Sequence, residues 1–228
     1  ASLPPSLIVA GTTSGVCKTT VSLAIMYSLK NRMGYNVQPF KVGPDFIDPT
    51  YHNIITGKQS KNLDAWMMGK EGITRSVYDA SEDVDIVVIE GVMGLYDGLS
   101  GKTDFASTAY VAKVLDAQVI LIIDAGKAAR SVAAMAMGYI QFDKALKIGG
   151  IILNNVAGEK HARYIKEAFE QKIKVPIIGI ISRNKELRLR ERHLGLIPTD
   201  ELDQKMKKKV LDIARSAADE ISFDALLK

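Results

Sequence analysis

The stretch that decides the fold of this chain reads Gly11-Thr12-Thr13-Ser14-Gly15-Val16-Cys17-Lys18-Thr19-Thr20. It follows an apolar run, residues 7–10, which predicts a buried strand, and it precedes residues 21–27, which have the composition of a helix. A strand, a glycine-containing turn, Lys-Thr and a helix form the arrangement in which backbone N–H groups and the positive end of a helix dipole bind a polyphosphate. The stretch therefore predicts a site for a nucleoside triphosphate.

Two residues of this loop carry the chemistry expected at the phosphates. Lys18 would place a positive charge at the β- and γ-phosphates, and Thr19 would offer a hydroxyl to Mg²⁺. The other residues that we expect to contact the nucleotide are Gly11, Thr12, Ser14, Gly15, Val16, Cys17 and Thr20. The alternative, a plain strand-turn-helix with threonines capping the helix, does not explain why Lys-Thr comes directly after a strand.

The loop departs from the usual phosphate-binding spacing at its end. Five residues separate Gly11 from Cys17, and Cys17 stands where the final glycine normally lies. A Cβ at that point would crowd the phosphate or require a backbone angle that cysteine disfavours. We therefore expect a lower nucleotide affinity than in a relative with glycine there.

The composition limits the classes of protein to which the chain can belong. Its 228 residues, 47% of them hydrophobic, suffice for one domain with a central sheet and helices on both faces. We expect no membrane span and no signal peptide, and the one cysteine excludes an internal disulfide and fits a reducing cytoplasm. The charge of +4 is mild, and the basic runs at 183–192 and 205–209 lack interleaved aromatic residues, so we expect no nucleic acid; they are solvated helix faces or attract a polyanionic ligand.

Apolar runs alternate with helical patterns along the rest of the chain. The strands expected after the first lie at residues 36–42, 85–90, 118–124, 148–154 and 176–181. The helices expected between them lie at 103–116, 128–142 and 160–171, and residues 201–228 read as one long helix and a short one. This alternation predicts an α/β fold, P-loop NTPase-like, with a mostly parallel sheet and right-handed crossovers.

Ligands of such sheets bind outside the carboxyl ends of the strands, and the second strand ends in a run of charged residues. That run is Lys41-Val42-Gly43-Pro44-Asp45-Phe46-Ile47-Asp48-Pro49-Thr50-Tyr51-His52. Asp48 before Pro49 is a good helix N-cap, whereas two carboxylates beside a triphosphate would suit Mg²⁺ coordination or catalysis. Both interpretations stay open at this point.

The third strand ends in a second acidic segment, Glu90-Gly91-Val92-Met93-Gly94-Leu95-Tyr96-Asp97-Gly98. A carboxylate at a strand end before a glycine-rich turn is where P-loop proteins place a metal-organising acid. We therefore expect Asp45, Asp48, Glu90 and Asp97 around one Mg²⁺–phosphate centre. A glycine-rich connection with solvated acids is the alternative.

Two further segments suggest ligand contacts. Asn154 and Asn155 follow the strand expected at 148–154, where their amides could read the adenine edge or simply favour a turn. In the segment 190–198, Arg192 is the better candidate for a phosphate or carboxylate, because a lone histidine such as His193 is more often structural.

Taken together, these motifs resemble the cobyrinic acid a,c-diamide synthase family. The resemblance covers about residues 6–201 and rests on the loop, the Gly-Pro-Asp-Phe-Ile-Asp-Pro run, the Glu90–Gly98 segment, Arg192-His193-Leu194-Gly195-Leu196, and Asn62-Leu63-Asp64 with Trp66-Met67-Met68. Dethiobiotin synthetases, which are similar in fold, share the stretched loop but lack the Gly-Pro-Asp-Phe-Ile-Asp-Pro run.

The resemblance implies a ligase that uses ATP to phosphorylate the a- and c-side-chain carboxylates of a tetrapyrrole, after which ammonia forms each amide. On that pattern the phosphate and catalytic residues are Lys18, Asp45, Asp48, Glu90 and Asp97. Mg²⁺ would be held by Thr19, Glu90 and one of the two acids in the Gly-Pro-Asp run, Asp45 by preference. The tetrapyrrole would be bound by Lys41, Phe46, Ile47, Tyr96, Arg192 and His193.

Full-length members of that family continue into a glutaminase domain with a nucleophilic cysteine. This chain has only Cys17, in the loop, so we expect a single ATP-dependent synthetase domain over residues 1–228, either a fragment or a chain that receives ammonia from a separate glutaminase partner. By itself it would use free ammonia, and a homodimer is the favoured assembly. The alternatives are a nickel sirohydrochlorin a,c-diamide synthase of the same family, a dethiobiotin synthetase-like ligase, and a partitioning-type switch ATPase. The last type usually has an extra lysine early in the loop, which Gly11-Thr12-Thr13 lacks.

Overall fold

The fold is that of one parallel sheet, seen in a computed structural model that describes residues 3–183 and 204–223. Seven strands are hydrogen-bonded in the order β3-β2-β4-β1-β5-β6-β7. The strands are β1 Ser6–Gly11, β2 Val37–Val42, β3 Lys61–Leu63, β4 Ile86–Glu90, β5 Gln118–Asp124, β6 Lys147–Val156 and β7 Ile177–Ser182. All six neighbouring pairs run parallel, which confirms the α/β class predicted from the sequence.

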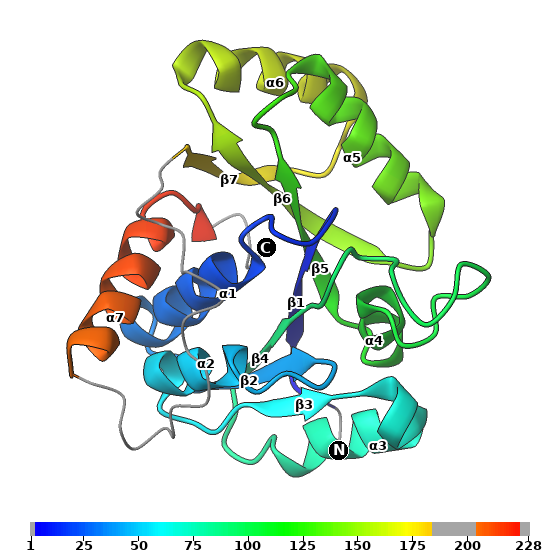
Figure 1. Ribbon diagram of the computed structural model, residues 1–228, viewed down its shortest axis with the longest axis vertical. Helices are drawn as coiled ribbons and strands as arrows, with labels where there is room; N and C mark the ends of the chain where they lie inside the picture. Colours follow the sequence, from blue (N-terminus) through cyan, green and yellow to red (C-terminus); the bar gives the residue numbers. More distant parts are fainter. Residues whose placement is uncertain (1–2, 184–203, 224–228) are drawn as a thin grey trace.

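Helices cover both faces of the sheet (Figure 1). One face carries α1 Lys18–Tyr27, extended by a π-helical turn at Ser28–Arg32, together with α2 Asp48–Thr56 and α7 Gln204–Ala218. The other face carries α3 Ala65–Asp79, α4 Thr108–Val114, α5 Arg130–Phe142 and α6 Glu159–Lys172. Within the described residues, no helix combines the length and hydrophobicity that a bilayer crossing requires.

The central strand β1 shows why the strands read as continuous apolar runs. Leu7 and Val9 belong to the core beneath α1 and α7, whereas Ile8 and Ala10 belong to the core on the opposite face. Successive side chains of a strand point to opposite faces, so a strand that is covered on both faces must be apolar at every position.

Three elements differ from the sequence-based predictions. The helix expected at 103–116 is confined to α4, because the Ser107 hydroxyl caps it by accepting the Tyr110 N–H and Ala106 adopts a left-handed φ of 64° just before. Strand β3 was not predicted, because a strand of three residues carries no readable period. Helix α3 was not predicted either, and its helical pattern is interrupted at the non-helical Gly69. The expected tail helix is present as α7, and residues 201–203 and 224–228 of that prediction lie outside the described residues.

The carboxyl ends of β1, β2 and β4 lie side by side. Val9 of β1 pairs with Glu90 of β4, and Lys41 of β2 pairs with the same Glu90. Consequently the loop after β1, the acidic loop after β2 and the glycine-rich turn after β4 meet at one edge of the sheet, where doubly wound α/β proteins bind ligands.

Candidate functional site

The loop after β1 ends at a strained residue. Cys17 is the N-cap of α1 and has φ 71° and ψ 38°, a left-handed conformation that favours glycine. This confirms the prediction that the position demands a backbone angle cysteine disfavours. At the other end of the loop, a Cβ on Gly11 would overlap Val16 and lie 2.9 Å from the Thr13 carbonyl, so only glycine fits there.

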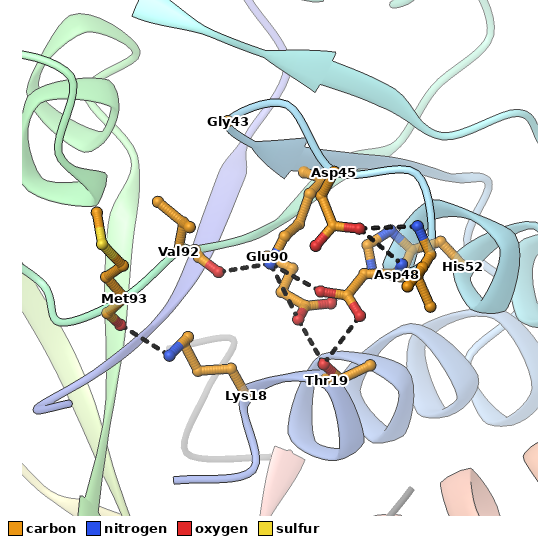
Figure 2. A network of polar contacts seen from close by, with 12 residues as sticks. Lys18, Thr19, Gly43, Asp45, Asp48, His52, Glu90, Val92 and Met93 are labelled. Atoms are coloured by element: carbon orange, nitrogen blue, oxygen red, sulfur yellow. Dashed lines mark hydrogen bonds and ion pairs between the residues drawn. The ribbon is translucent and has the colours of Figure 1, made fainter. Parts of the chain in front are cut away.

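Lys18 connects this loop to the turn after β4. Its Nζ donates to the Met93 carbonyl at 2.7 Å (Figure 2). It also donates to the Thr13 carbonyl at 3.2 Å. Met93 itself has a left-handed φ of 47°, which is part of the turn that presents its carbonyl to the lysine. The ammonium therefore lies between the two loops at which the sequence predicts phosphates.

Glu90 is the centre of a buried cluster of charged side chains. One carboxylate oxygen, Oε1, accepts the Thr19 hydroxyl at 2.7 Å and lies 3.3 Å from Lys41 Nζ, and the other, Oε2, lies 2.6 Å from His52 Nε2. Burial alone would raise the pKa of Glu90, but the Lys41 charge and the His52 hydrogen bond outweigh it and lower this pKa to about 2. Glu90 is therefore a carboxylate at neutral pH, although its side chain is almost wholly buried.

His52 orients Glu90 from the interior. An ionised carboxylate only accepts hydrogen bonds, so His52 Nε2 carries the proton in this contact. Its Nδ1 lies 2.9 Å from the hydroxyl oxygen of Ser60, and the imidazole is completely buried. These two contacts fix the plane of the imidazole ring, and a ring held in this way orients the carboxylate that it contacts.

Asp48 completes the cluster. Its carboxylate lies 2.9 Å from Lys41 Nζ and 3.4 Å from the Thr19 hydroxyl. Burial and the negative charge of Glu90 raise the pKa of Asp48 to about 8, against the opposing attraction of Lys41. Burial also acts to lower the pKa of Lys41, but the two carboxylates outweigh it and raise this pKa, so Lys41 keeps its charge. We refer to Thr19, Lys41, Asp48, His52 and Glu90 as the charge network.

Asp45, and not Asp48, accepts the backbone N–H groups at the start of α2. Asp45 Oδ1 accepts the N–H groups of Ile47 at 2.8 Å and Asp48 at 3.2 Å, so Asp45 supports the start of α2. The N-cap interpretation of Asp48 is therefore wrong, because α2 has no side-chain cap at its N-cap position and Asp48 faces Lys41 and Thr19 instead. Asp45 was the acid preferred for Mg²⁺, yet it is Asp48 that lies beside Thr19.

A pocket of about 220 Å³ gathers the phosphate loop and the charge network. Its lining residues come from the ends of β2 and β4 and from the segments that follow β1, β2 and β4: Ser14, Gly15, Lys18, Thr19, Lys41, Asp45, Ile47, Asp48, Glu90, Val92 and Met93. Figure 2 shows the carboxylates of Asp48 and Glu90 directed toward the Thr19 hydroxyl, while Lys18 points to the Met93 carbonyl. Most of the predicted phosphate, metal and catalytic side chains therefore share one site.

The oxygen atoms of this site suit Mg²⁺ better than a metal that needs a protein cage. Among residues 3–183 and 204–223, no group of three or more His, Cys, Asp and Glu side chains could hold a metal ion by itself. Mg²⁺ usually takes one or two protein oxygens and completes its shell with phosphates and water. The Thr19 hydroxyl and the carboxylates of Glu90 and Asp48 form such a partial set.

The two asparagines predicted to contact adenine differ in their surroundings: Asn154 contacts the phosphate loop, and Asn155 lines a second pocket. The Asn154 amide donates to the Val16 carbonyl at 3.1 Å, which ties β6 to the phosphate loop. Asn155, with a left-handed φ of 59°, lines a second pocket of about 530 Å³ together with Asp124, Gly126, Lys127 and Arg183. Arg192 and His193 lie outside the described residues.

Tyr96 and Asp97 contact the protein and not the pocket. The Tyr96 hydroxyl donates to the Tyr139 carbonyl at 2.6 Å, and its ring packs against Tyr139 and Phe142 of α5. Asp97 accepts the Gly94 N–H at 3.0 Å and so holds the turn after β4. Neither residue lines the 220 Å³ pocket.

Sequence reasoning missed three residues that support the site. His52 could have been found, because it lies one helical turn after Asp48 in α2 and so shares its face. Asn62 donates to the Gly43 and Asp45 carbonyls, at 2.7 Å each, and the Tyr139 hydroxyl donates to the Thr12 carbonyl at 2.6 Å. These three bonds join residues that are 17 to 127 positions apart in the chain, so no local pattern predicts them.

Comparison with known proteins shows the family to which this chain belongs. The model of the CobQ/CobB/MinD/ParA nucleotide binding domain matches residues 7–197. Cobyrinate a,c-diamide synthase of Synechococcus sp. is 45% identical over 197 residues, and hydrogenobyrinate a,c-diamide synthase of Streptomyces coelicolor is 42% identical over 223 residues. These matches cover 86% and 98% of this chain but 43% and 46% of the relatives, so the chain spans less than half the length of either.

Solved structures share the fold at low sequence identity. The MinD cell division protein of Aquifex aeolicus superposes with a TM-score of 0.53 at 16% identity, covering 93% of this chain and 96% of that one. The signal recognition particle receptor FtsY of Elizabethkingia anophelis, in complex with GDP, gives a TM-score of 0.57 at 16% identity, covering 94% and 64%. At this identity the likeness establishes the P-loop NTPase-like fold alone.

Proposed function

Because the chain belongs to the CobQ/CobB/MinD/ParA nucleotide-binding domain family, we propose that it is an ATP-dependent ligase that converts side-chain carboxylates of a tetrapyrrole into amides. The observation that carries the proposal is the meeting of Lys18, Thr19 and the buried Glu90 in one pocket. The names of the relatives, cobyrinate and hydrogenobyrinate a,c-diamide synthase, supply the substrate class and the a- and c-positions.

In the first step, a carboxylate oxygen of the substrate attacks the γ-phosphorus of ATP, and the bond from that phosphorus to the leaving ADP oxygen breaks. The barrier is largely electrostatic, because two anions must meet. The loop amides at the start of α1, the Lys18 ammonium and the fixed charge of Lys41 would lower it. The product is an acyl phosphate.

Mg²⁺ would be held by Thr19 with Glu90 and Asp48, and would supply positive charge that neutralises the phosphate oxygens. Asp48 replaces Asp45 in this proposal, since Asp48 is the acid beside Thr19. His52 and Lys41 keep the Glu90 carboxylate ionised and oriented.

In the second step, ammonia attacks the carbonyl carbon of the acyl phosphate, phosphate leaves, and a proton passes from nitrogen to a base. Asp45 and Asp97 stay predictions for orienting the substrate or receiving that proton. Asp45 lines the pocket, whereas Asp97 holds the turn after β4, so Asp45 is the better placed of the two.

The 228-residue chain should use ammonium and not glutamine. Its only cysteine, Cys17, occupies the N-cap position of α1 in the phosphate loop, so residues 1–228 offer no second thiol for glutamine hydrolysis. We further propose that the chain acts as a homodimer in the cytoplasm. Light scattering behind size-exclusion chromatography checks the assembly: a mass of one chain would contradict the dimer.

The experiment that tests the proposed function is incubation of the chain with MgATP, ammonium and candidate macrocycles, followed by mass spectrometry. Hydrogenobyrinate, cobyrinate and nickel sirohydrochlorin form parallel arms, with glutamine replacing ammonium in a second series. Ammonium-dependent diamide formation from one macrocycle, with release of ADP, is the expected result. A rate of ATP hydrolysis that is the same with and without every macrocycle, and no amide product, would contradict the proposed function.

A further inference from the structure

Exposed apolar side chains are concentrated at one edge of the molecule. Of the twelve large apolar side chains that are exposed in the described part, six follow the carboxyl ends of three neighbouring strands. We call these six the apolar rim: Phe46 and Ile47 after β2, Trp66 and Met67 after β3, and Met93 and Leu99 after β4. Such a concentration on a soluble domain marks a binding surface.

The apolar rim is continuous with the phosphate pocket. Ile47 and Met93 line that pocket themselves. The Asn62 amide binds the Gly43 and Asp45 carbonyls, which fixes the end of β3 against the loop that carries Phe46 and Ile47. A ligand that lies over Ile47 and Met93 is therefore beside the charge network.

The exposure of Trp66 and Met67 is not imposed by core packing. Asp64 caps α3 by accepting the N–H groups of both residues, at 2.9 and 3.3 Å, while their side chains are 68% and 78% exposed. Gly69, with φ 63° and ψ −173°, interrupts the helix directly after this first turn. The helix thus holds Trp66 and Met67 on a separate first turn, and neither residue belongs to the two hydrophobic core clusters of the described residues.

Cations accompany the rim. Exposed Lys70 comes three residues after Met67, and exposed Lys102 comes three residues after Leu99. An apolar surface with positive charges at its margin is complementary to a ligand that has an apolar body and negatively charged arms.

We propose that Trp66, Met67 and Leu99, with Phe46, form the platform on which one face of the macrocycle lies while a carboxylate arm enters the phosphate pocket. Lys70 and Lys102 then pair with further carboxylates at the edge of the ring. This assignment rests on the proposed function, and it adds the residues that select a large ring over a small carboxylic acid. Aromatic and thioether side chains suit a flat, polarisable ring.

The test is the double substitution Trp66→Ala/Met67→Ala, with Tyr78→Ala as the matched control, since Tyr78 is also an exposed aromatic residue of α3. Equilibrium dialysis, followed by the visible absorbance of hydrogenobyrinate or cobyrinate, gives Kd for the macrocycle, and a parallel titration gives Kd for MgATP. We expect macrocycle Kd to rise about tenfold or more in the double variant, MgATP Kd to stay unchanged, and Tyr78→Ala to match the unsubstituted chain. Trp66→Phe should recover most of the affinity.

Three results would overturn the platform. If the unsubstituted chain converts the macrocycle and the double variant binds it as tightly as Tyr78→Ala does, the platform is wrong and the proposed function stands. If the double substitution changes the molar mass in light scattering but not the macrocycle Kd, the rim is an interface between copies of the chain. If the unsubstituted chain neither binds nor converts any macrocycle, the proposed function fails, and the platform with it.

Discussion

The charge network and the apolar rim lie at the same edge of the sheet but are built in opposite ways. The charge network is buried, and its polar groups are paired with one another by hydrogen bonds and ion pairs. Glu90, for example, contacts Thr19, Lys41 and His52. The rim is exposed, and only its backbone is fixed, as Asp64 fixes Trp66 and Met67. Reacting atoms need charges that do not move, whereas a large ring needs an apolar surface that is left open.

This difference predicts a division of effects. Substitutions in the charge network should lower kcat and disturb folding, because they leave buried charges without partners. Substitutions in the apolar rim should raise KM for the macrocycle and leave the fold intact. The following substitutions test this division, in order of decreasing effect.

The largest effect is expected from Glu90→Gln. The amide keeps the shape but removes the charge that Lys41 and His52 face, so kcat should fall by about 10³-fold. ADP release with ammonium and the macrocycle measures this, and Glu82→Gln, at an exposed acid, is the control. A kcat of Glu90→Gln within tenfold of that of the unsubstituted chain would show that the charge of Glu90 is not required for the reaction.

His52→Ala should have the next largest effect, lowering kcat by about 10- to 100-fold while KM for the macrocycle changes little. The Gln side chain can place an N–H where Nε2 lies, so His52→Gln should recover part of kcat, and His52→Asn should not. If His52→Ala and His52→Gln lose kcat equally while both fold, orientation of Glu90 by His52 is not the cause.

Asp48 gives the network a dependence of stability on pH. Its pKa of about 8 in the folded chain lies above the ordinary 3.8, so its protonated form stabilises the fold fully below about pH 4, and this contribution is lost as the pH rises through 8. Glu90 acts in the opposite sense: its pKa of about 2 lies below the ordinary 4.5, so its contribution is present above pH 4.5 and lost toward pH 2. Without Mg²⁺ and nucleotide, the free energy of unfolding should therefore decrease between pH 5 and 8, by about 1 kcal/mol or more.

Urea unfolding at several pH values in that range measures this slope. Asp48→Asn should flatten it, whereas Asp212→Asn, at an exposed acid of α7, should leave it unchanged. An identical slope in Asp48→Asn and the unsubstituted chain would assign the dependence to other groups.

The smallest effect is expected from Cys17→Gly. Glycine adopts the left-handed conformation of this position without strain, so the substitution should stabilise the fold by about 1 kcal/mol and tighten MgATP binding several-fold. Thermal unfolding and nucleotide titration measure both, and the macrocycle Kd should not change. A destabilised Cys17→Gly variant would show that the thiol makes a contact worth more than the strain.

How far the sequence predicts this site depends on how local each signal is. Lys18 and Thr19 were predicted because they start the helix that follows the loop after a buried strand, and Glu90 because it ends another such strand. Parallel strands end at one edge of the sheet, so these residues meet there. The spacing of Asp45 and Asp48 could not show which carboxylate lies beside Thr19, since that depends on the hydrogen bonds that begin α2. Tyr96 illustrates the same limit, because its partner Tyr139 lies on a helix distant in the chain.

The rim shows a different limit. Trp66 and Met67 belong to a motif quoted from the sequence, but an apolar pair at the start of a helix reads as core until burial is known. Only their exposure, beside a pocket lined by Ile47 and Met93, separates a binding surface from a packed helix face.

The most direct test of the account follows oxygen atoms through the reaction. The macrocycle is labelled with ¹⁸O in its side-chain carboxylates, converted with unlabelled MgATP and ammonium, and the released phosphate is analysed by ³¹P NMR. If a carboxylate oxygen is transferred to the γ-phosphorus, each amide formed releases one phosphate that contains one ¹⁸O atom. Amide formation that releases phosphate without ¹⁸O would contradict phosphorylation of the carboxylate at the charge network.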